Sequence, residues 1–279
     1  MRAAIRFASA SSSPFWSLDM YTPFESPKFL LSQTYENLQE FQRICNAVFS
    51  GDCGTHITEV DPETGNKTYK IKFTRHIPGR ARHIIATAIS DLRHTLDQAA
   101  CDAIHVITEQ RPDRVIYFPF ATNPNDLAGR LAKNFPHEIH PVFLSFETYP
   151  TGPGYPGGDA LLSTFAKISG PNKHQVTCRA GGRIADFSAE SVWCDGLVLD
   201  MAFPPQWNIH DNELVLAIVE PNATLHYDFK VAFYVALHEA GELSGRPALD
   251  TLSTIANKVS KIVYTLETTT MKIASTRSA

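Results

Sequence analysis

The sequence predicts an α+β protein in which a helical layer packs on an antiparallel β-sheet or sandwich. Three observations carry this prediction: a helical periodicity near each end of the chain, a longer one between them, and a series of alternating apolar runs after residue 170. The chain has 279 residues, of which 43% are hydrophobic and 19% charged, as in a packed globular protein. We expect a disordered tail over residues 1–25 and a single α+β domain over residues 26–279.

The helical part of the domain is expected over about residues 26–170. Ser26 and Pro27 are typical of a helix start, and apolar residues follow at three- and four-residue steps to about residue 49. Residues 56–73 predict a β-hairpin, because a turn-forming stretch, DPETGN, is followed by alternating apolar and polar residues. A second helix over about 80–109 buries a stripe that includes Leu92 and Leu96, and its length marks it as the central helix. Short helices are expected near 125–133 and 138–147, and again just before Gly170.

The β-rich part is expected over about residues 171–245, as four or more antiparallel strands. Its apolar runs are rich in valine, isoleucine and phenylalanine and are separated by turn residues. A closing amphipathic helix follows over about 247–268. Neither terminal helix can bury its apolar stripe alone, so both are expected to pack alongside the central helix.

Composition narrows the class of protein. A net charge of −4 and a pI near 6.2 leave nucleic-acid binding open but do not support it. No apolar run reaches the ~18 residues of a membrane span, so no membrane association is expected. Five scattered cysteines without a C-x-x-C pair predict reduced thiols and a cytoplasmic protein, with no metal site and no cofactor. A homo-oligomer is left open.

Two polar groups are candidates for a binding site. Arg93 and Asp97 are one turn apart on the same edge of the central helix, where a guanidinium and a carboxylate can pair. Lys173 and His174 lie in a turn between a short helix and the first strand of the β-rich part, and such a pair can bind an anion. We expect this turn to pack against the Arg93/Asp97 edge, because charged groups that become buried must satisfy one another.

Four short motifs occur in an order that resembles an uncharacterised bacterial protein family: LRHTLDQ, YFPF, FETYPTG and GPNKHQ. The resemblance covers about residues 80–265. Positions that match the family motifs are Leu92, Arg93, Leu96, Asp97, Phe118, Pro119, Tyr149, Lys173 and His174. The chain departs from the family at Gln98, Asn172 and Gln175, where the family has histidine, aspartate and arginine. The resemblance therefore implies that any chemistry at the family's site is weakened or lost here.

These observations favour a protein that binds an anionic ligand or a macromolecular partner through Arg93, Asp97, Lys173, His174 and Tyr149. One alternative is a metal-independent nuclease or other hydrolase, connected with defence or toxin biology. Arg93 and the position five residues later are similar to the R-x4-6-H signature of the HEPN ribonucleases, but the glutamine at that position cannot act as a general base. The other alternative is a structural or interaction protein in which the polar residues form a buried organising network.

Overall fold

The computed structural model describes residues 21–50, 54–73, 76–170, 179–208, 213–238 and 240–277. It has the predicted α+β class, with long helices and antiparallel sheets. Most of the expected tail and the turn that carries Lys173 and His174 lie outside the described residues.

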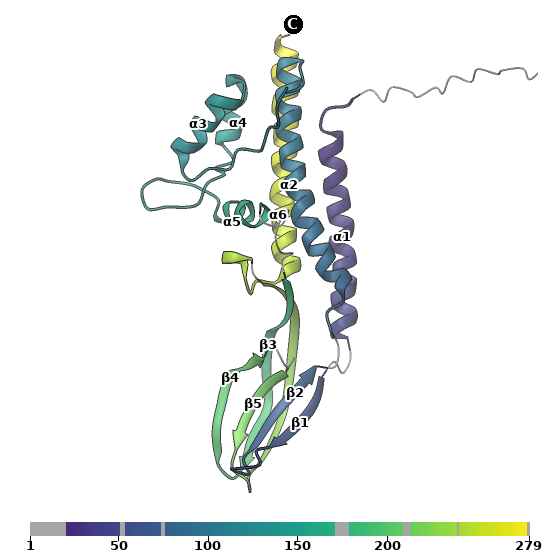
Figure 1. The fold of residues 1–279 in the computed structure, drawn as a ribbon, viewed down its shortest axis with the longest axis vertical. Coiled ribbons are helices and arrows are strands. Elements are labelled where there is room, and N and C mark those ends of the chain that lie inside the picture. The colour runs from purple at the N-terminus through teal and green to yellow at the C-terminus, as the bar shows by residue number, and fades with distance from the viewer. Residues whose placement is uncertain are drawn as a thin grey trace, which may run out of the picture.

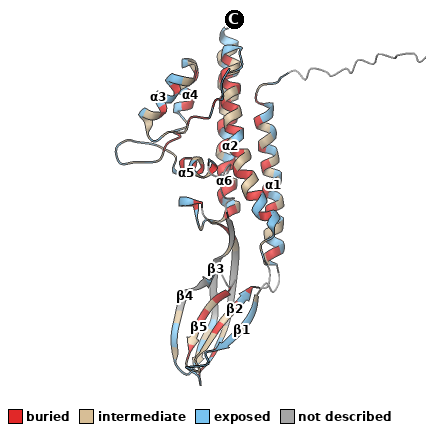
Figure 2. Ribbon diagram, viewed as in Figure 1, coloured by how far each residue is buried: buried red, intermediate tan, exposed pale blue. Residues whose placement is uncertain are grey.

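Three long helices lie side by side and form one half of the molecule (Figure 1): α1 (Glu25–Phe49), α2 (Gly79–Thr108) and α6 (Ala248–Arg277). The middle helix is α2, which packs against both α1 and α6. Its fully buried residues include Ile85, Leu92 and Leu96. Figure 2 shows buried residues along most of the length of all three helices. The prediction that both terminal helices pack alongside the second helix is confirmed.

The closing helix is longer than the predicted 247–268, because it continues to Arg277. Beyond the predicted limit, Thr270 is fully buried and its hydroxyl donates to the Leu266 carbonyl at 2.7 Å, and Ile273 packs against the helical core. Beyond it, the Arg277 guanidinium donates to the Ile107 carbonyl near the end of α2 at 2.8 Å. Core packing and the contact of Arg277 with α2 therefore stabilise a last segment that lies beyond the predicted limit of the helix.

The prediction of a disordered tail over residues 1–25 is corrected at its C-terminal end. Phe24 is fully buried, and its backbone N–H donates to Asp102 Oδ2 in α2 at 2.8 Å. Tyr21 also reaches Asp102, to which its hydroxyl donates. Residues 21–25 are thus fixed on α2 by a buried carboxylate, a partner that lies 78 residues away and that local composition cannot reveal.

Six strands of the described residues form two antiparallel sheets at the opposite end of the molecule from the C-terminus (Figure 1). One sheet has the order β1-β2-β5-β4, made from β1 (Gly54–Val60), β2 (Lys67–Phe73), β5 (Glu213–Val219) and β4 (Val198–Asn208). The other pairs the two longest strands, β3 (Arg179–Asp195) and β6 (Thr224–His238). The early hairpin is therefore joined to a late strand, since β2 pairs with β5.

The helices and the sheets meet end to end (Figure 1), so the helical layer packs on one end of the two sheets. Two separate hydrophobic clusters explain this arrangement, one in the helices and one between the two sheets. The apolar stripes of the helices are used against one another, and the inner faces of the sheets cover each other, as in a sandwich. The link is the end of β6, where Val235 and Leu237 enter the helical cluster.

Small helices form an arm beside α2 and α6: α3 (Pro124–Asn134), a 3-10 turn (His137–Ile139), α4 (His140–Leu144) and α5 (Ala160–Ser169). The segment 110–123 connects the end of α2 to this arm and crosses α2, to which the Phe118 N–H is hydrogen-bonded through Asp97. No helix within the described ranges is long and apolar enough to cross a membrane.

Candidate functional site

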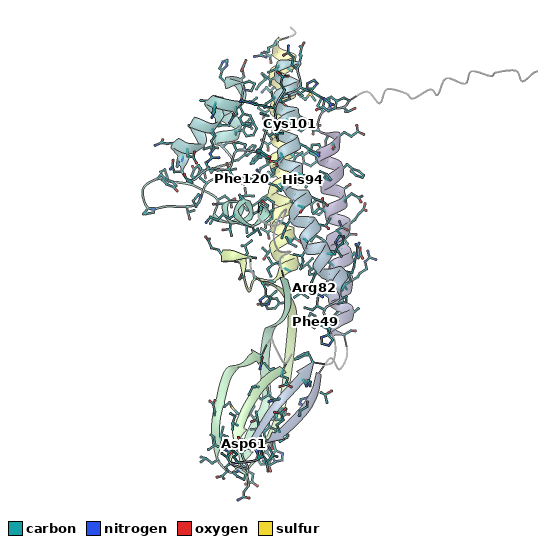
Figure 3. All side chains as sticks on the ribbon, in the orientation of Figure 1. Phe49, Asp61, Arg82, His94, Cys101 and Phe120 are labelled. Atoms are coloured by element: carbon teal, nitrogen blue, oxygen red, sulfur yellow. The ribbon has the colours of Figure 1, made fainter. Side chains whose placement is uncertain are left out.

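Arg93 and Asp97 form a two-pronged ion pair on α2. Arg93 Nε lies 3.2 Å from Asp97 Oδ2, and Arg93 Nη2 lies 3.2 Å from Asp97 Oδ1. The two side chains are only 15% and 13% exposed, and the guanidinium lies 4.8 Å from the ring centroid of Phe120. Figure 3 shows Phe120 between α2 and the arm of small helices. The Arg93 side chain is thus held from one side by a carboxylate and from the other by an aromatic face.

The same carboxylate holds the crossing segment. Asp97 Oδ1 accepts the backbone N–H of Phe118 at 2.8 Å, so one side chain binds both Arg93 and the chain that leaves α2. On the far side of this segment, the Thr148 hydroxyl donates to the Pro119 carbonyl at 2.6 Å. The Ala121 N–H donates back to the Thr148 carbonyl at 2.9 Å. Three motifs of the family resemblance, which are far apart in the sequence, therefore meet in one hydrogen-bonded junction.

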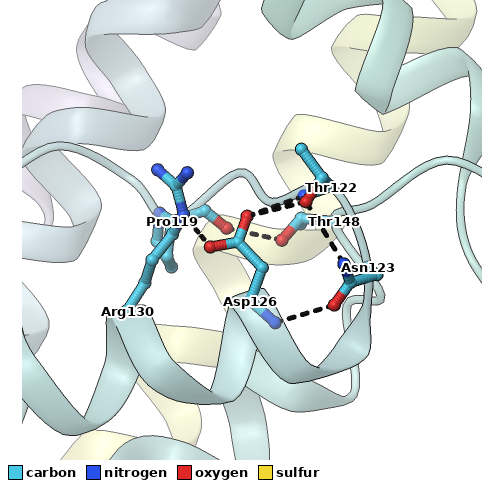
Figure 4. Close-up of polar contacts among 6 residues, drawn as sticks. All are labelled: Pro119, Thr122, Asn123, Asp126, Arg130 and Thr148. Atoms are coloured by element: carbon cyan, nitrogen blue, oxygen red, sulfur yellow. Dashed lines mark hydrogen bonds and ion pairs between the residues drawn. The ribbon is translucent and has the colours of Figure 1, made fainter.

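The start of α3 extends this junction (Figure 4). Asn123 is its N-cap and accepts the Asp126 N–H at 2.9 Å. The Asp126 carboxylate accepts from Arg130 at 2.9 Å and from the backbone N–H of Thr122, also at 2.9 Å. These contacts, the one to Arg130 first, lower the pKa of Asp126 below its ordinary value. The carboxylate is therefore ionised at neutral pH, which favours its position at a helix N-terminus.

Tyr149 lies inside the protein rather than at a surface where a ligand could reach it. Its side chain is 5% exposed and packs edge-on against Tyr155, with ring centroids 5.5 Å apart. Burial, then the neighbouring Glu147 carboxylate, raises the pKa of its hydroxyl. In this motif the residue that contacts the junction is Thr148, and Tyr149 contributes to the core.

The position of the second predicted group is not part of the described chain. Lys173 and His174 lie within residues 171–178, so their approach to Arg93 and Asp97 stays a prediction. Of the predicted site residues, the structure joins Arg93 directly to Asp97 and places Tyr149 next to the junction they form.

A groove of about 670 Å³ runs along α2 beside the junction. Six lining residues come from α2, and five of them fall within an arc of about 100° on the helix: His94, Gln98, Cys101, Asp102 and His105. Figure 3 labels two of them, His94 and Cys101, along α2. The opposite walls are the N-terminal segment at Tyr21 and Ser26 and the chain from Arg111 to Tyr117. Asp97 lies at the edge, so the junction and the groove share a residue.

Both carboxylates among the described residues that line the groove already have partners. Asp97 binds Arg93 and the Phe118 N–H, and Asp102 binds the Tyr21 hydroxyl and the Phe24 N–H. Burial, together with the hydrogen bond to Asp102, raises the pKa of Tyr21 far above its ordinary value. This phenol is therefore a hydrogen-bond donor at every physiological pH.

The remaining groups give the groove an aromatic and cationic character. The Arg111 guanidinium lies 4.1 Å from the ring centroid of Tyr21. The His105 ring packs edge-on against the same tyrosine at 5.0 Å, and its buried Nδ1 has no hydrogen-bond partner among the described residues. Burial raises the pKa of the Cys101 thiol, which is therefore protonated at neutral pH and unsuited to act as a nucleophile.

Sequence reasoning did not find His105 and placed His94 outside the site. It followed the apolar stripe of α2 and its nearest polar edge, whereas the groove lies on the face opposite Leu92. The signal was a second stripe, in which polar residues recur at spacings of four, three, one and three between positions 94 and 105. Gln98 belongs to this stripe and accepts a hydrogen bond from the Ser26 hydroxyl at 2.8 Å.

Comparison with known proteins finds no family model, curated protein or solved structure that matches this chain. In the described ranges, no group of three or more histidine, cysteine, aspartate or glutamate side chains could hold a metal ion.

Proposed function

We propose that this protein binds an anionic ligand with an apolar or aromatic part in the groove along α2. The observation that carries the proposal is the charge of the described residues that line this hollow: Arg93 neutralises Asp97, and Arg111 and Arg114 outnumber the remaining carboxylate, Asp102. Its volume of about 670 Å³ falls within the usual range of small-molecule sites, ~300–1,000 Å³. Tyr21 and Tyr117 add aromatic surface.

In this proposal Arg93 and Asp97 position the wall of the groove and do not contact the ligand through their charges. Their charges neutralise each other, and Asp97 fixes the backbone at Phe118. The chain from Arg111 to Tyr117 precedes that anchor directly, so its placement depends on it. In this proposal the Arg93–Asp97 pair organises the structure, and the adjacent groove binds the ligand.

Binding without cleavage fits the groove better than a nuclease does. Acid–base cleavage of a phosphodiester needs one group that takes a proton and one that returns it. His94 and His105 line the groove, but eleven residues of α-helix separate them by ~16 Å along the axis. That separation is too large for both rings to serve one scissile bond, so within the described residues the pair supports recognition rather than catalysis.

An aromatic anion tests the proposal directly. The fluorescence of 8-anilinonaphthalene-1-sulfonate would be titrated with the folded protein and with the Arg111→Gln and Arg82→Gln variants. Arg82 is the control because it is an exposed arginine of α2, the helix along which the groove runs, near the other end of that helix (Figure 3). We expect saturable binding that weakens about tenfold in Arg111→Gln, the loss of one charge-assisted contact, and is unchanged in Arg82→Gln. Equal affinities in all three proteins would refute the proposed site.

A further inference from the structure

A second, smaller hollow of about 330 Å³ lies beside the groove. The two share one wall, the chain from Arg114 to Tyr117. Along this wall Val115 and Tyr117 are 75% and 60% exposed, whereas Ile116 is 6% exposed. This alternation is typical of extended chain, in which three residue steps span ~10 Å. A single extended segment therefore separates the two hollows, and its exposed side chains, Val115 and Tyr117, are apolar or aromatic.

The two hollows differ in chemistry. Three cationic residues line the smaller one, Arg114, Arg130 and Lys133, together with the amide of Asn134, and no carboxylate is among the described residues that line it. The larger groove has two arginines as well, Arg111 and Arg114, but more of its surface is apolar or aromatic. A ligand that uses both would carry its negative charge on one side of the wall and its flat apolar part on the other.

The cations of the smaller hollow are not all used within the protein. Arg130 pairs with Asp126 at 2.9 Å, and Arg114 donates to the Lys133 carbonyl at 3.2 Å. The ammonium of Lys133 is exposed and has no partner among the described residues. The last turn of α3 would repel an anion through its carbonyl groups. Two of these carbonyls are already covered, that of Lys133 by Arg114 and that of Leu131 by the Phe135 N–H.

We infer that the two hollows form one bipartite site for a phosphorylated ligand with an aromatic ring system, of the nucleotide class. The phosphate would lie against Lys133, Arg114 and Arg130, and the ring would lie in the α2 groove against Tyr21, Tyr117 and His105. Arginine and lysine are the side chains that bind phosphate most strongly, and aromatic rings stack on bases of any sequence. This inference rests on the proposed anion-binding function and adds the ligand class and the phosphate-binding residues.

Calorimetric titrations of the whole protein test this assignment. The probes are adenosine and uridine, their 5′-monophosphates, inorganic phosphate, and a single-stranded RNA hexamer. The variants are Lys133→Gln for the smaller hollow and Arg111→Gln for the larger groove. Lys261→Gln is the control, because this exposed lysine of α6 lies in neither hollow.

We expect each nucleotide to bind about tenfold more tightly than its nucleoside, and Lys133→Gln to remove that advantage while leaving nucleoside binding unchanged. Arg111→Gln should weaken both, and Lys261→Gln neither. Binding of the hexamer in place of free nucleotides, with the same dependence on Lys133, identifies nucleic acid as the source of the phosphate. Equal affinity for nucleosides and nucleotides, or a phosphate advantage that survives Lys133→Gln, overturns the inference.

The outcomes also separate this inference from the proposed function. Anion binding that depends on Arg111 but shows no preference for phosphate leaves the groove as a site and refutes only the bipartite assignment. A protein that binds none of these anions and no aromatic sulfonate refutes both.

Discussion

Replacing Asp97 by alanine should lower the free energy of unfolding more than replacing an exposed aspartate does, because Asp97 joins α2 to the crossing segment. The carboxylate accepts the Phe118 N–H at 2.8 Å and the Arg93 Nε–H at 3.2 Å, and Arg93 Nη2 lies 3.2 Å from Asp97 Oδ1 in the ion pair. Loss of the acceptor for a part-buried backbone N–H costs about 1–3 kcal/mol. The lost ion pair adds about 1 kcal/mol, less than a fully buried pair, because the Arg93 side chain retains 15% of its exposure.

Alanine regains about 0.5 kcal/mol of helix propensity, so the net expected destabilisation of Asp97→Ala is about 2.5 kcal/mol. With a urea dependence of ~1–3 kcal/mol per molar, the midpoint should fall by about 1 M. Asp97→Asn should lose less, because its amide oxygen can still accept the Phe118 N–H. The exposed Asp113 is the matched control, and Asp113→Ala should stay within about 0.5 kcal/mol of the parent protein.

The assay is urea unfolding followed by circular dichroism at 222 nm, which reports mainly the helices, and by tryptophan fluorescence, to which Trp193 in β3 contributes. Because the helices and the sheets have separate hydrophobic clusters, the helical transition should move more than the fluorescence transition. If Asp97→Ala unfolds at the same urea concentration as Asp113→Ala, the carboxylate does not anchor the crossing segment and this reasoning is wrong.

Three further predictions concern backbone strain, pH and catalysis. Gly158→Ala should clearly lower the melting temperature, because φ at this residue is +97° and the new Cβ would lie 2.7 Å from a backbone oxygen. Gly154→Ala is the control and should leave the melting temperature unchanged, because a Cβ there would have no atom within 4 Å. The pKa of Glu213 is lowered, first by its hydrogen bond from Lys70. The ionised carboxylate therefore stabilises the fold fully above the pKa of glutamate in the unfolded chain, ~4.3. This stabilisation is lost as pH falls through the lower pKa of Glu213 in the folded protein. Acid unfolding of Glu213→Gln should accordingly depend less on pH between these two values. Labelled RNA and DNA should remain intact with the parent protein in EDTA and in magnesium, and cleavage abolished by His105→Ala would instead support an enzyme.

Local patterns in the sequence determined the identity of the main elements. The helices α1 and α2 begin and end within about two residues of the predicted limits, because apolar residues at three- and four-residue steps need no distant partner to be recognised. The hairpin of β1 and β2 and the strands of the β-rich part follow from alternation in the same way. The Arg93–Asp97 pair is also local, since one helical turn joins its members.

Only the tertiary structure decided how these elements pack and which distant residues they bring into contact. The end-to-end arrangement depends on which apolar faces cover which, and a single face has the same pattern whether a helix or a sheet covers it. Tyr21 and Phe24 are held by Asp102, and the Phe118 backbone is held by Asp97, through contacts between residues 21 to 81 positions apart. The groove on α2 arises because such contacts bring the N-terminal segment and the crossing chain to opposite sides of a polar stripe, and a hydrogen bond between distant residues leaves no periodicity in the sequence.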